Sequence, residues 1–269
     1  MAIAEITLHS NSLGTNSSVT VCMPECPDGG WKPGVKYQVL WLMPGGGGDG
    51  SEWARFTCIE QYALQYNFFA ISPATYMSLY TDMYYGNPDK FFTYISEELP
   101  QMMRWMFPIS TAKEDNFVAG FSMGGYGAFK LAMTYPDSFA ALGTFGGVHD
   151  MVDTVTRNHL HDGVLDRHFF LAFNTVEDLV GSKNDAMYLA EKNAERGNFG
   201  PRMFFSVGED DFCNSFNVRA RDRLTAKGYE ITWDVAPGNH SYLYCESRLK
   251  TFIEWAGFRG SPISVGAAQ

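Results

Sequence analysis

The stretch NFVAGFSMGGYGAFK, residues 116–130, decides how this chain folds. It begins with a short apolar run, passes through a Gly-x-Ser-x-Gly turn at residues 120–124, and continues as a helix-forming segment. A sharp turn from a strand into a helix holds its central serine in a strained backbone conformation, and side chains in place of the flanking glycines would collide with neighbouring elements. The helix that follows directs its unpaired N–H groups and the positive end of its dipole towards the serine. These features predict that Ser122 is an activated nucleophile.

The segments on either side of this turn alternate between expected strands and expected helices. We predict strands at residues 5–9, 17–23, 37–43, 68–72, 116–121, 139–145, 203–207 and 229–235. We predict helices at residues 51–66, 88–107, 123–135, 216–227 and 241–255. The first two strands form an antiparallel lead-in, and the later alternation predicts a parallel sheet covered on both faces. With the serine turn near its middle, this order predicts an α/β-hydrolase fold in a single domain of residues 1–269: a mostly parallel central sheet flanked by helices.

Residues 148–200 interrupt the alternation. The segment is longer than an ordinary crossover and mixes helical pieces with polar loop residues. An excursion of this length between two strands is usually functional. We therefore expect residues 148–200 to form a cap-like insertion within the domain.

A run of glycines, GGGGDG at residues 45–50, directly follows the strand expected to end at Met43. Consecutive glycines let the backbone approach a ligand and present its N–H groups without obstruction. A phosphate-binding loop would need Gly-Lys-Ser/Thr after the glycines, and no lysine stands there. Dinucleotide-binding spacing is possible on paper but is poorly placed. An oxyanion hole fits the serine turn better, with the backbone N–H groups of Gly46 and Met123 as its two donors.

The base and the acid of a nucleophilic triad should follow the serine in the chain. Of the six histidines, only His240 lies beyond the last expected strand, in a loop that precedes a helix, and we predict that it is the base. The acid should follow the strand ending at Val207, where Glu209, Asp210 and Asp211 all offer a carboxylate. A buried carboxylate at that position would fix the histidine tautomer. Position alone leaves the choice among the three open.

Charge and cysteine usage narrow the classes of partner. The formal net charge of −10 repels phosphate backbones and anionic membrane surfaces, so we expect neither nucleic acid nor membrane as a partner.

The five cysteines are odd in number and scattered, which does not fit a disulfide framework: Cys22, Cys26, Cys58, Cys213 and Cys245. We expect no metal site and no cofactor, because the Cys22–Cys26 pair lacks a second ligand pair and the His159–His161 pair lacks a third ligand. The two histidines are expected to face solvent.

The chain also shows no sign of export or membrane insertion. Residues 1–7 lack the basic flank and apolar run of a signal peptide. No window approaches the roughly 18–20 apolar residues that a membrane span requires. These observations predict a cytoplasmic protein.

Several motifs carry a resemblance that extends over nearly the whole chain. They lie at residues 44–53, 80–82, 97–100, 119–128, 208–212 and 238–240. Through them the chain resembles the esterase D-like "Putative esterase" family, which includes bacterial tributyrin esterases, feruloyl and acetyl esterases, and S-formylglutathione hydrolases. Family members commonly carry a Gly-x-x-Asp-Phe segment whose aspartate is the triad acid, and Asp211-Phe212 matches it, so the resemblance favours Asp211 over Asp210. One departure is Pro44, which stands where the family usually has a histidine before the oxyanion glycine.

The resemblance implies a serine carboxylic-ester hydrolase that acts on small acyl or aryl esters, including acetyl or feruloyl groups on sugars. The alternatives are an S-formylglutathione hydrolase and an acyltransferase that uses the same triad. Relatives of this kind also suggest self-association into a homo-oligomer. We predict substrate contacts for Trp53, Tyr80 and Tyr242. Further aromatic residues are candidates for the lining of an apolar pocket: Tyr84, Tyr85, Phe169, Phe170 and Phe173.

Overall fold

A central eight-stranded sheet organises the structure, a computed structural model that describes residues 2–25, 33–86, 89–260 and 263–264. Its strand order is β1-β2-β5-β4-β6-β7-β10-β11. The β1–β2 and β2–β5 pairs are antiparallel, and every later pair in this order is parallel. The bounds are β1 (Ala2–Ser10), β2 (Thr15–Met23), β4 (Gln38–Met43), β5 (Phe68–Pro73), β6 (Asn116–Phe121), β7 (Ala141–Phe145), β10 (Arg202–Gly208) and β11 (Ile231–Ala236). The predicted α/β-hydrolase fold is confirmed.

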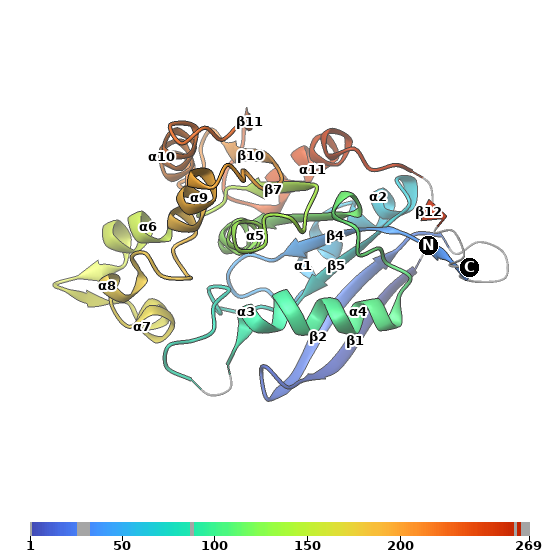
Figure 1. Ribbon diagram of the computed structural model, residues 1–269, viewed down its shortest axis with the longest axis horizontal. Helices are drawn as coiled ribbons and strands as arrows, with labels where there is room; N and C mark the ends of the chain where they lie inside the picture. The colour runs from blue at the N-terminus through green and yellow to red at the C-terminus, as the bar shows by residue number, and fades with distance from the viewer. Residues whose placement is uncertain (1, 26–32, 87–88, 261–262, 265–269) are drawn as a thin grey trace.

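Helices cover both faces of the sheet (Figure 1). One layer contains α4 (Leu99–Met106), α5 (Met123–Thr134), α9 (Ala186–Glu195) and α10 (Asn214–Thr225). The other contains α1 (Glu52–Phe56), α2 (Ile59–Gln65) and α11 (Tyr242–Ala256). Alternation along β4 explains the two cores, because successive strand side chains point to opposite faces. Trp41 joins the first core, and its neighbours Leu40 and Leu42 join the second.

Two predicted helices are broken in the structure. The helix expected at 51–66 divides into α1 and α2 because Thr57 adopts an extended conformation. The Cys58 N–H donates to the Glu246 carboxylate of α11 at 2.7 Å, so a tertiary contact stabilises the break. The helix expected at 88–107 comprises α3 (Phe91–Thr93), a π-helical turn at Tyr94–Glu98 and α4. Residues 87–88 lie outside the described part.

Residues 148–200 hold four helices and a hairpin between β7 and β10. They are α6 (Met151–Asn158), α7 (Arg167–Phe173), α8 (Val176–Leu179), α9, and the strands β8 (Leu160–His161) and β9 (Val164–Leu165). In Figure 1, α6, α7 and α8 lie together at one side of the molecule, whereas α9 packs against α5. The remaining small sheet pairs β3 (Val35–Lys36) with β12 (Ile263–Ser264).

Within the described ranges, no helix is both long enough and apolar enough to cross a bilayer. Cys22, Cys58, Cys213 and Cys245 are free thiols. Cys26, the second member of the Cys22–Cys26 pair, lies outside the described residues.

Candidate active site

Ser122 occupies the turn between β6 and α5 in a strained backbone conformation. Its φ of 55° and ψ of −121° lie in a region that residues other than glycine rarely adopt. Packing explains the two flanking glycines. A Cβ on Gly120 would lie 2.0 Å from the Gly124 carbonyl oxygen, and a Cβ on Gly124 would lie 2.0 Å from the Met43 carbonyl oxygen. The turn therefore requires glycine on both sides, and it presents Ser122 at the carboxyl edge of the sheet.

Three side chains from three loops at this edge form a hydrogen-bonded chain. Ser122 Oγ lies 2.8 Å from His240 Nε2, and His240 Nδ1 lies 2.9 Å from both carboxylate oxygens of Asp211. The Asp211 side chain is 1% exposed, and its Oδ1 also accepts the Cys213 N–H at 2.7 Å. The neighbouring Asp210 is exposed, and its side chain takes no part in this chain of contacts. The structure thus brings Ser122, His240 and Asp211 together.

Residues not anticipated from the sequence hold the imidazole and carboxylate in place. The rings of Phe121 and Phe212 lie on His240, with centroid distances of 4.6 and 4.3 Å. Gly146 follows β7 with a φ of 54°, and a Cβ there would lie 2.5 Å from Asp211 Oδ2. In the sequence, the Gly146-Gly147 pair directly after a predicted strand is the signal that could have indicated this close approach to the Asp211 carboxylate.

The two predicted oxyanion donors both lie beside Ser122. Gly46, Ser122 and Met123 line the same pocket. Across the described residues, neither the Gly46 N–H nor the Met123 N–H donates to another protein atom. Two unpaired N–H groups next to a nucleophile can stabilise negative charge that develops on a substrate oxygen.

The pocket that opens over Ser122 has a volume of about 340 Å³. Most of its wall is apolar, and apart from Ser122 and Cys213 its polar side chains lie on α6 and just after it. It is lined by Gly46, Met77, Leu79, Ser122, Met123, Val148, Met151, Thr154, Asn158, His159, Phe169, Phe212, Cys213 and Phe216. None of these residues is lysine or arginine. A larger hollow of about 660 Å³ lies at the start of β10 and β11, and none of its lining residues belongs to the Ser122–His240–Asp211 group.

None of the three aromatic residues predicted to contact substrate, Trp53, Tyr80 and Tyr242, lines this pocket. Trp53 is fully buried and packs edge-on against Phe145 and Tyr242. Tyr80 is also fully buried, and its hydroxyl donates to the Pro44 carbonyl at 2.7 Å. The Tyr242 hydroxyl accepts the Gly45 N–H at 3.2 Å. The two tyrosine hydroxyls therefore contact the glycine loop, and Trp53 packs against one of these tyrosines.

Of the other aromatic candidates, only Phe169 reaches the pocket. Tyr85 stacks on Phe170 outside it, and Phe173 lies in the core. His159 was expected to face solvent but lines the pocket, where it stacks on Phe169 with a centroid distance of 4.0 Å. Its Nδ1 lies 2.9 Å from Asp166 Oδ2, because the β8–β9 hairpin folds the two residues together.

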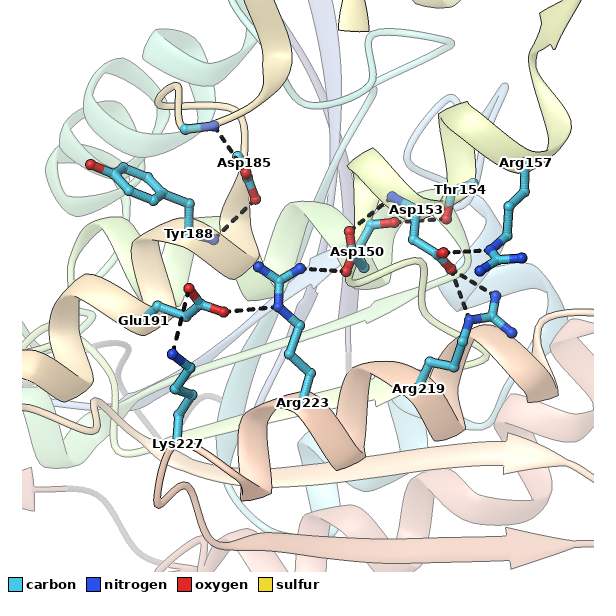
Figure 2. A network of polar contacts seen from close by, with 11 residues as sticks. Asp150, Asp153, Thr154, Arg157, Asp185, Tyr188, Glu191, Arg219, Arg223 and Lys227 are labelled. Carbon is cyan, nitrogen blue, oxygen red and sulfur yellow. Dashed lines mark hydrogen bonds and ion pairs between the residues drawn. The ribbon is translucent and has the colours of Figure 1, made fainter. Parts of the chain in front are cut away.

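An ion-pair network fixes α6, which carries Met151, Thr154 and Asn158 into the pocket wall (Figure 2). Arg219 of α10 donates from Nε and Nη2 to Asp153 Oδ2, at 3.0 and 2.7 Å. Arg223 bridges Asp150, at the start of α6, and Glu191 of α9, with both distances 2.8 Å. The network therefore ties the insertion to the helix that follows β10.

In the described part of the chain, Asp211, Cys213 and His240 are a group of three potential metal ligands, with their ligand atoms within 4.8 Å of one another. The same three residues belong to the hydrogen-bonded chain that begins at Ser122 or adjoin it. Burial, reinforced by the Asp211 charge, raises the pKa of the Cys213 thiol to about 12. His240 Nδ1 and the Asp211 carboxylate are already paired with each other.

Comparisons with known proteins identify an esterase family and several similar esterases and serine hydrolases. The family model described as "Putative esterase" matches residues 10–250. The chain is 24% identical over 267 residues to an acetyl esterase of Caldicellulosiruptor saccharolyticus, covering 95% of this chain and 98% of that protein. Its structure is similar to that of FphF, a fluorophosphonate-binding serine hydrolase of Staphylococcus aureus, with a TM-score of 0.83 and 28% identity over 95% and 98% of the two chains. It is also similar to the S-formylglutathione hydrolase FrmB of Staphylococcus aureus, with a TM-score of 0.80 and 27% identity over 95% and 99% of the two chains.

Proposed function

Since the chain belongs to the "Putative esterase" family and is a carboxylic ester hydrolase, we propose that Ser122 is its nucleophile, His240 its general base and Asp211 the carboxylate that orients the base. The observation that carries this proposal is the continuous contact from Ser122 Oγ through His240 to the buried Asp211, at 2.8 and 2.9 Å. It occurs next to two unpaired backbone N–H groups and an apolar pocket.

In the proposed reaction, His240 Nε2 accepts the Ser122 proton as Ser122 Oγ attacks the ester carbonyl carbon. The Gly46 and Met123 N–H groups bind the resulting oxyanion. His240 then gives the proton to the departing alcohol oxygen as the carbon–oxygen bond breaks, which leaves an acyl group on Ser122. Water, deprotonated by His240, attacks the acyl carbon, the bond to Ser122 Oγ breaks, and His240 returns the proton to Ser122 Oγ as the acid leaves.

The pocket supports small esters with an apolar acyl or aryl group. Its walls carry methionine, leucine, valine and phenylalanine side chains, and its volume of about 340 Å³ suits a small ligand. The acetyl esterase relative supports a short acyl group, including acetyl groups on sugars. Feruloyl esters fit the same proposal because an aromatic ring can contact Phe169 and Phe216.

A second candidate is hydrolysis of S-formylglutathione, which the similarity to FrmB favours. Glutathione carries two carboxylates, and the described pocket lining offers no lysine or arginine to pair with them. Measured rates of hydrolysis of neutral esters and of S-formylglutathione therefore separate the two candidates.

The test combines active-site labelling with a substrate panel. Wild-type protein should react with a fluorophosphonate probe and hydrolyse p-nitrophenyl acetate, and Ser122→Ala should lose both activities while remaining folded. Ser247→Ala is the matched control, because this hydroxyl lies on α11 and donates only to the Tyr244 carbonyl. Labelling that persists in Ser122→Ala would refute the assignment.

The panel then ranks kcat/KM for p-nitrophenyl acyl esters, methyl ferulate, acetylated xylo-oligosaccharides and S-formylglutathione. We expect the neutral esters to lead. Transfer to an added alcohol that strongly exceeds hydrolysis would instead indicate an acyltransferase.

A further inference from the structure

The peptide unit between Pro44 and Gly45 is held at both of its polar ends by tyrosine hydroxyls. The Tyr80 hydroxyl donates to the Pro44 carbonyl oxygen at 2.7 Å, and the Gly45 N–H donates to the Tyr242 hydroxyl at 3.2 Å. This carbonyl and this N–H belong to the same planar group and point in opposite directions. The two hydroxyls together therefore fix the rotation of the plane.

The other N–H groups of the glycine loop differ in whether they have an acceptor within the protein. Gly47 N–H donates to the Tyr76 carbonyl at 2.9 Å, and Gly48 N–H donates to the Gly45 carbonyl at 3.1 Å. Of the four glycine N–H groups at residues 45–48, Gly46 N–H is the one without a protein acceptor in the described structure. Gly46 and Ser122 line the same pocket. The loop leaves free only the donor that an oxyanion would use.

Tyr80 is itself firmly anchored. Its φ of 47° is strained for a side-chain-bearing residue, and its ring occupies the space where a Cβ on Gly127 would stand, 2.4 Å away. The fully buried Lys130 donates from Nζ to the Tyr80 carbonyl at 2.8 Å and to Asn184 Oδ1 at 2.6 Å. Thr75 Oγ1 donates to the Tyr80 hydroxyl at 3.2 Å, so the hydroxyl hydrogen is directed at Pro44.

Tyr242 is held by aromatic packing. Its ring lies 5.4 Å from the Trp53 ring, 4.8 Å from Phe121 and 5.6 Å from Phe56, measured between centroids. Burial raises the pKa of both tyrosines, so both hydroxyls stay protonated near neutral pH.

We propose that Tyr80 and Tyr242 are positioning residues that aim the Gly46 N–H at the oxyanion by clamping the Pro44–Gly45 peptide. The inference rests on the proposed function. A run of glycines has more backbone freedom than any other sequence, and an oxyanion donor is effective only when its direction is fixed before the reaction. The two tyrosine hydroxyls supply that rigidity by holding the peptide between Pro44 and Gly45.

The experiment compares Tyr80→Phe and Tyr242→Phe with Tyr229→Phe. Tyr229 is the matched control because its buried hydroxyl also donates to a backbone carbonyl, that of Ala190 at 2.8 Å, away from the glycine loop. Each protein is assayed with p-nitrophenyl acetate, with a trifluoromethyl ketone that forms a tetrahedral oxyanion on the serine, and by thermal unfolding.

We expect kcat of each clamp variant to fall by roughly 10–100-fold, somewhat less than the roughly 10²–10³-fold loss that follows complete removal of an oxyanion donor. KM should change by less than about twofold, because the contact matters in the transition state. The inhibition constant of the ketone should rise in parallel with the loss of kcat/KM. Tyr229→Phe should lose comparable stability and keep its kcat.

Two results would overturn the clamp. In one, both clamp variants retain wild-type kcat while turnover still depends on Ser122. In the other, Tyr229→Phe loses as much kcat as the clamp variants, which would indicate a general effect of stability. If wild-type turnover does not depend on Ser122, the proposed function itself fails, and Ser122→Ala detects this separately.

Discussion

Replacing Asp211 with asparagine tests the site with the smallest change in shape. The carboxylate makes two kinds of contact: Oδ1 accepts the Cys213 N–H at 2.7 Å, and both oxygens lie 2.9 Å from His240 Nδ1. In Asp211→Asn, the Cys213 N–H selects the amide oxygen for the Oδ1 position. The amide nitrogen must then take the Oδ2 position, where it donates to His240 Nδ1.

This reversal sets the size of the effect. With Nδ1 forced to accept, the imidazole proton moves to Nε2, and Nε2 can no longer accept the Ser122 proton. A wrong tautomer of this kind lowers kcat by about 10⁴-fold in the serine-protease triad. At about 1.36 kcal/mol per factor of ten, this corresponds to about 5.4 kcal/mol of transition-state stabilisation.

The assay is steady-state hydrolysis of p-nitrophenyl acetate by Asp211→Asn and by its control, Asp210→Asn. Asp210 is the neighbouring carboxylate, but it is exposed, and its substitution should leave kcat within about twofold because surface changes away from the site have small effects. Both variants should unfold at similar temperatures. Retention of more than a tenth of wild-type kcat by Asp211→Asn, or a large loss in Asp210→Asn, would refute the reasoning.

Two further predictions concern the core and the insertion. Burial lowers the pKa of His149 to about 3. Between pH 3 and about pH 6.5, His149 is protonated in the unfolded chain but not in the folded one, so the free energy of unfolding should fall as the pH falls, by at most about 1.4 kcal/mol per pH unit. His149→Leu should remove this contribution, which urea unfolding at pH 7 and pH 5 would measure. Arg223→Gln breaks the partly exposed bridges to Asp150 and Glu191, which should cost about 1 kcal/mol of stability. It should also raise KM for longer acyl esters more than for acetate, because α6 forms part of the pocket wall.

The controls follow from the same contacts. An identical pH slope in His149→Leu and wild type would show that His149 is not the group responsible. Lys192→Gln, which removes an exposed pair with Glu195 three residues away, is the control for Arg223→Gln and should leave both stability and KM unchanged. Equal KM values for Arg223→Gln and wild type with every ester would show that the network does not shape the pocket.

The sequence alone determined the features whose physics is local. The strand, glycine turn and helix at residues 116–130 constrain one another within fifteen residues, so the turn at Ser122 and the α/β-hydrolase order could be predicted. His240 could be selected because the chain order of strands places each following loop at the same edge of a parallel sheet.

Tertiary structure decided the features that depend on which way a side chain points. Asp210 and Asp211 are adjacent in the chain, yet only Asp211 is buried against His240. Tyr80 and Tyr242 lie in motifs near the site, but neither lines the pocket, and their hydroxyls form hydrogen bonds with the glycine loop. The wall at α6 depends on charges more than sixty residues away on α10, because ion pairs form between surfaces that only the folded chain brings together.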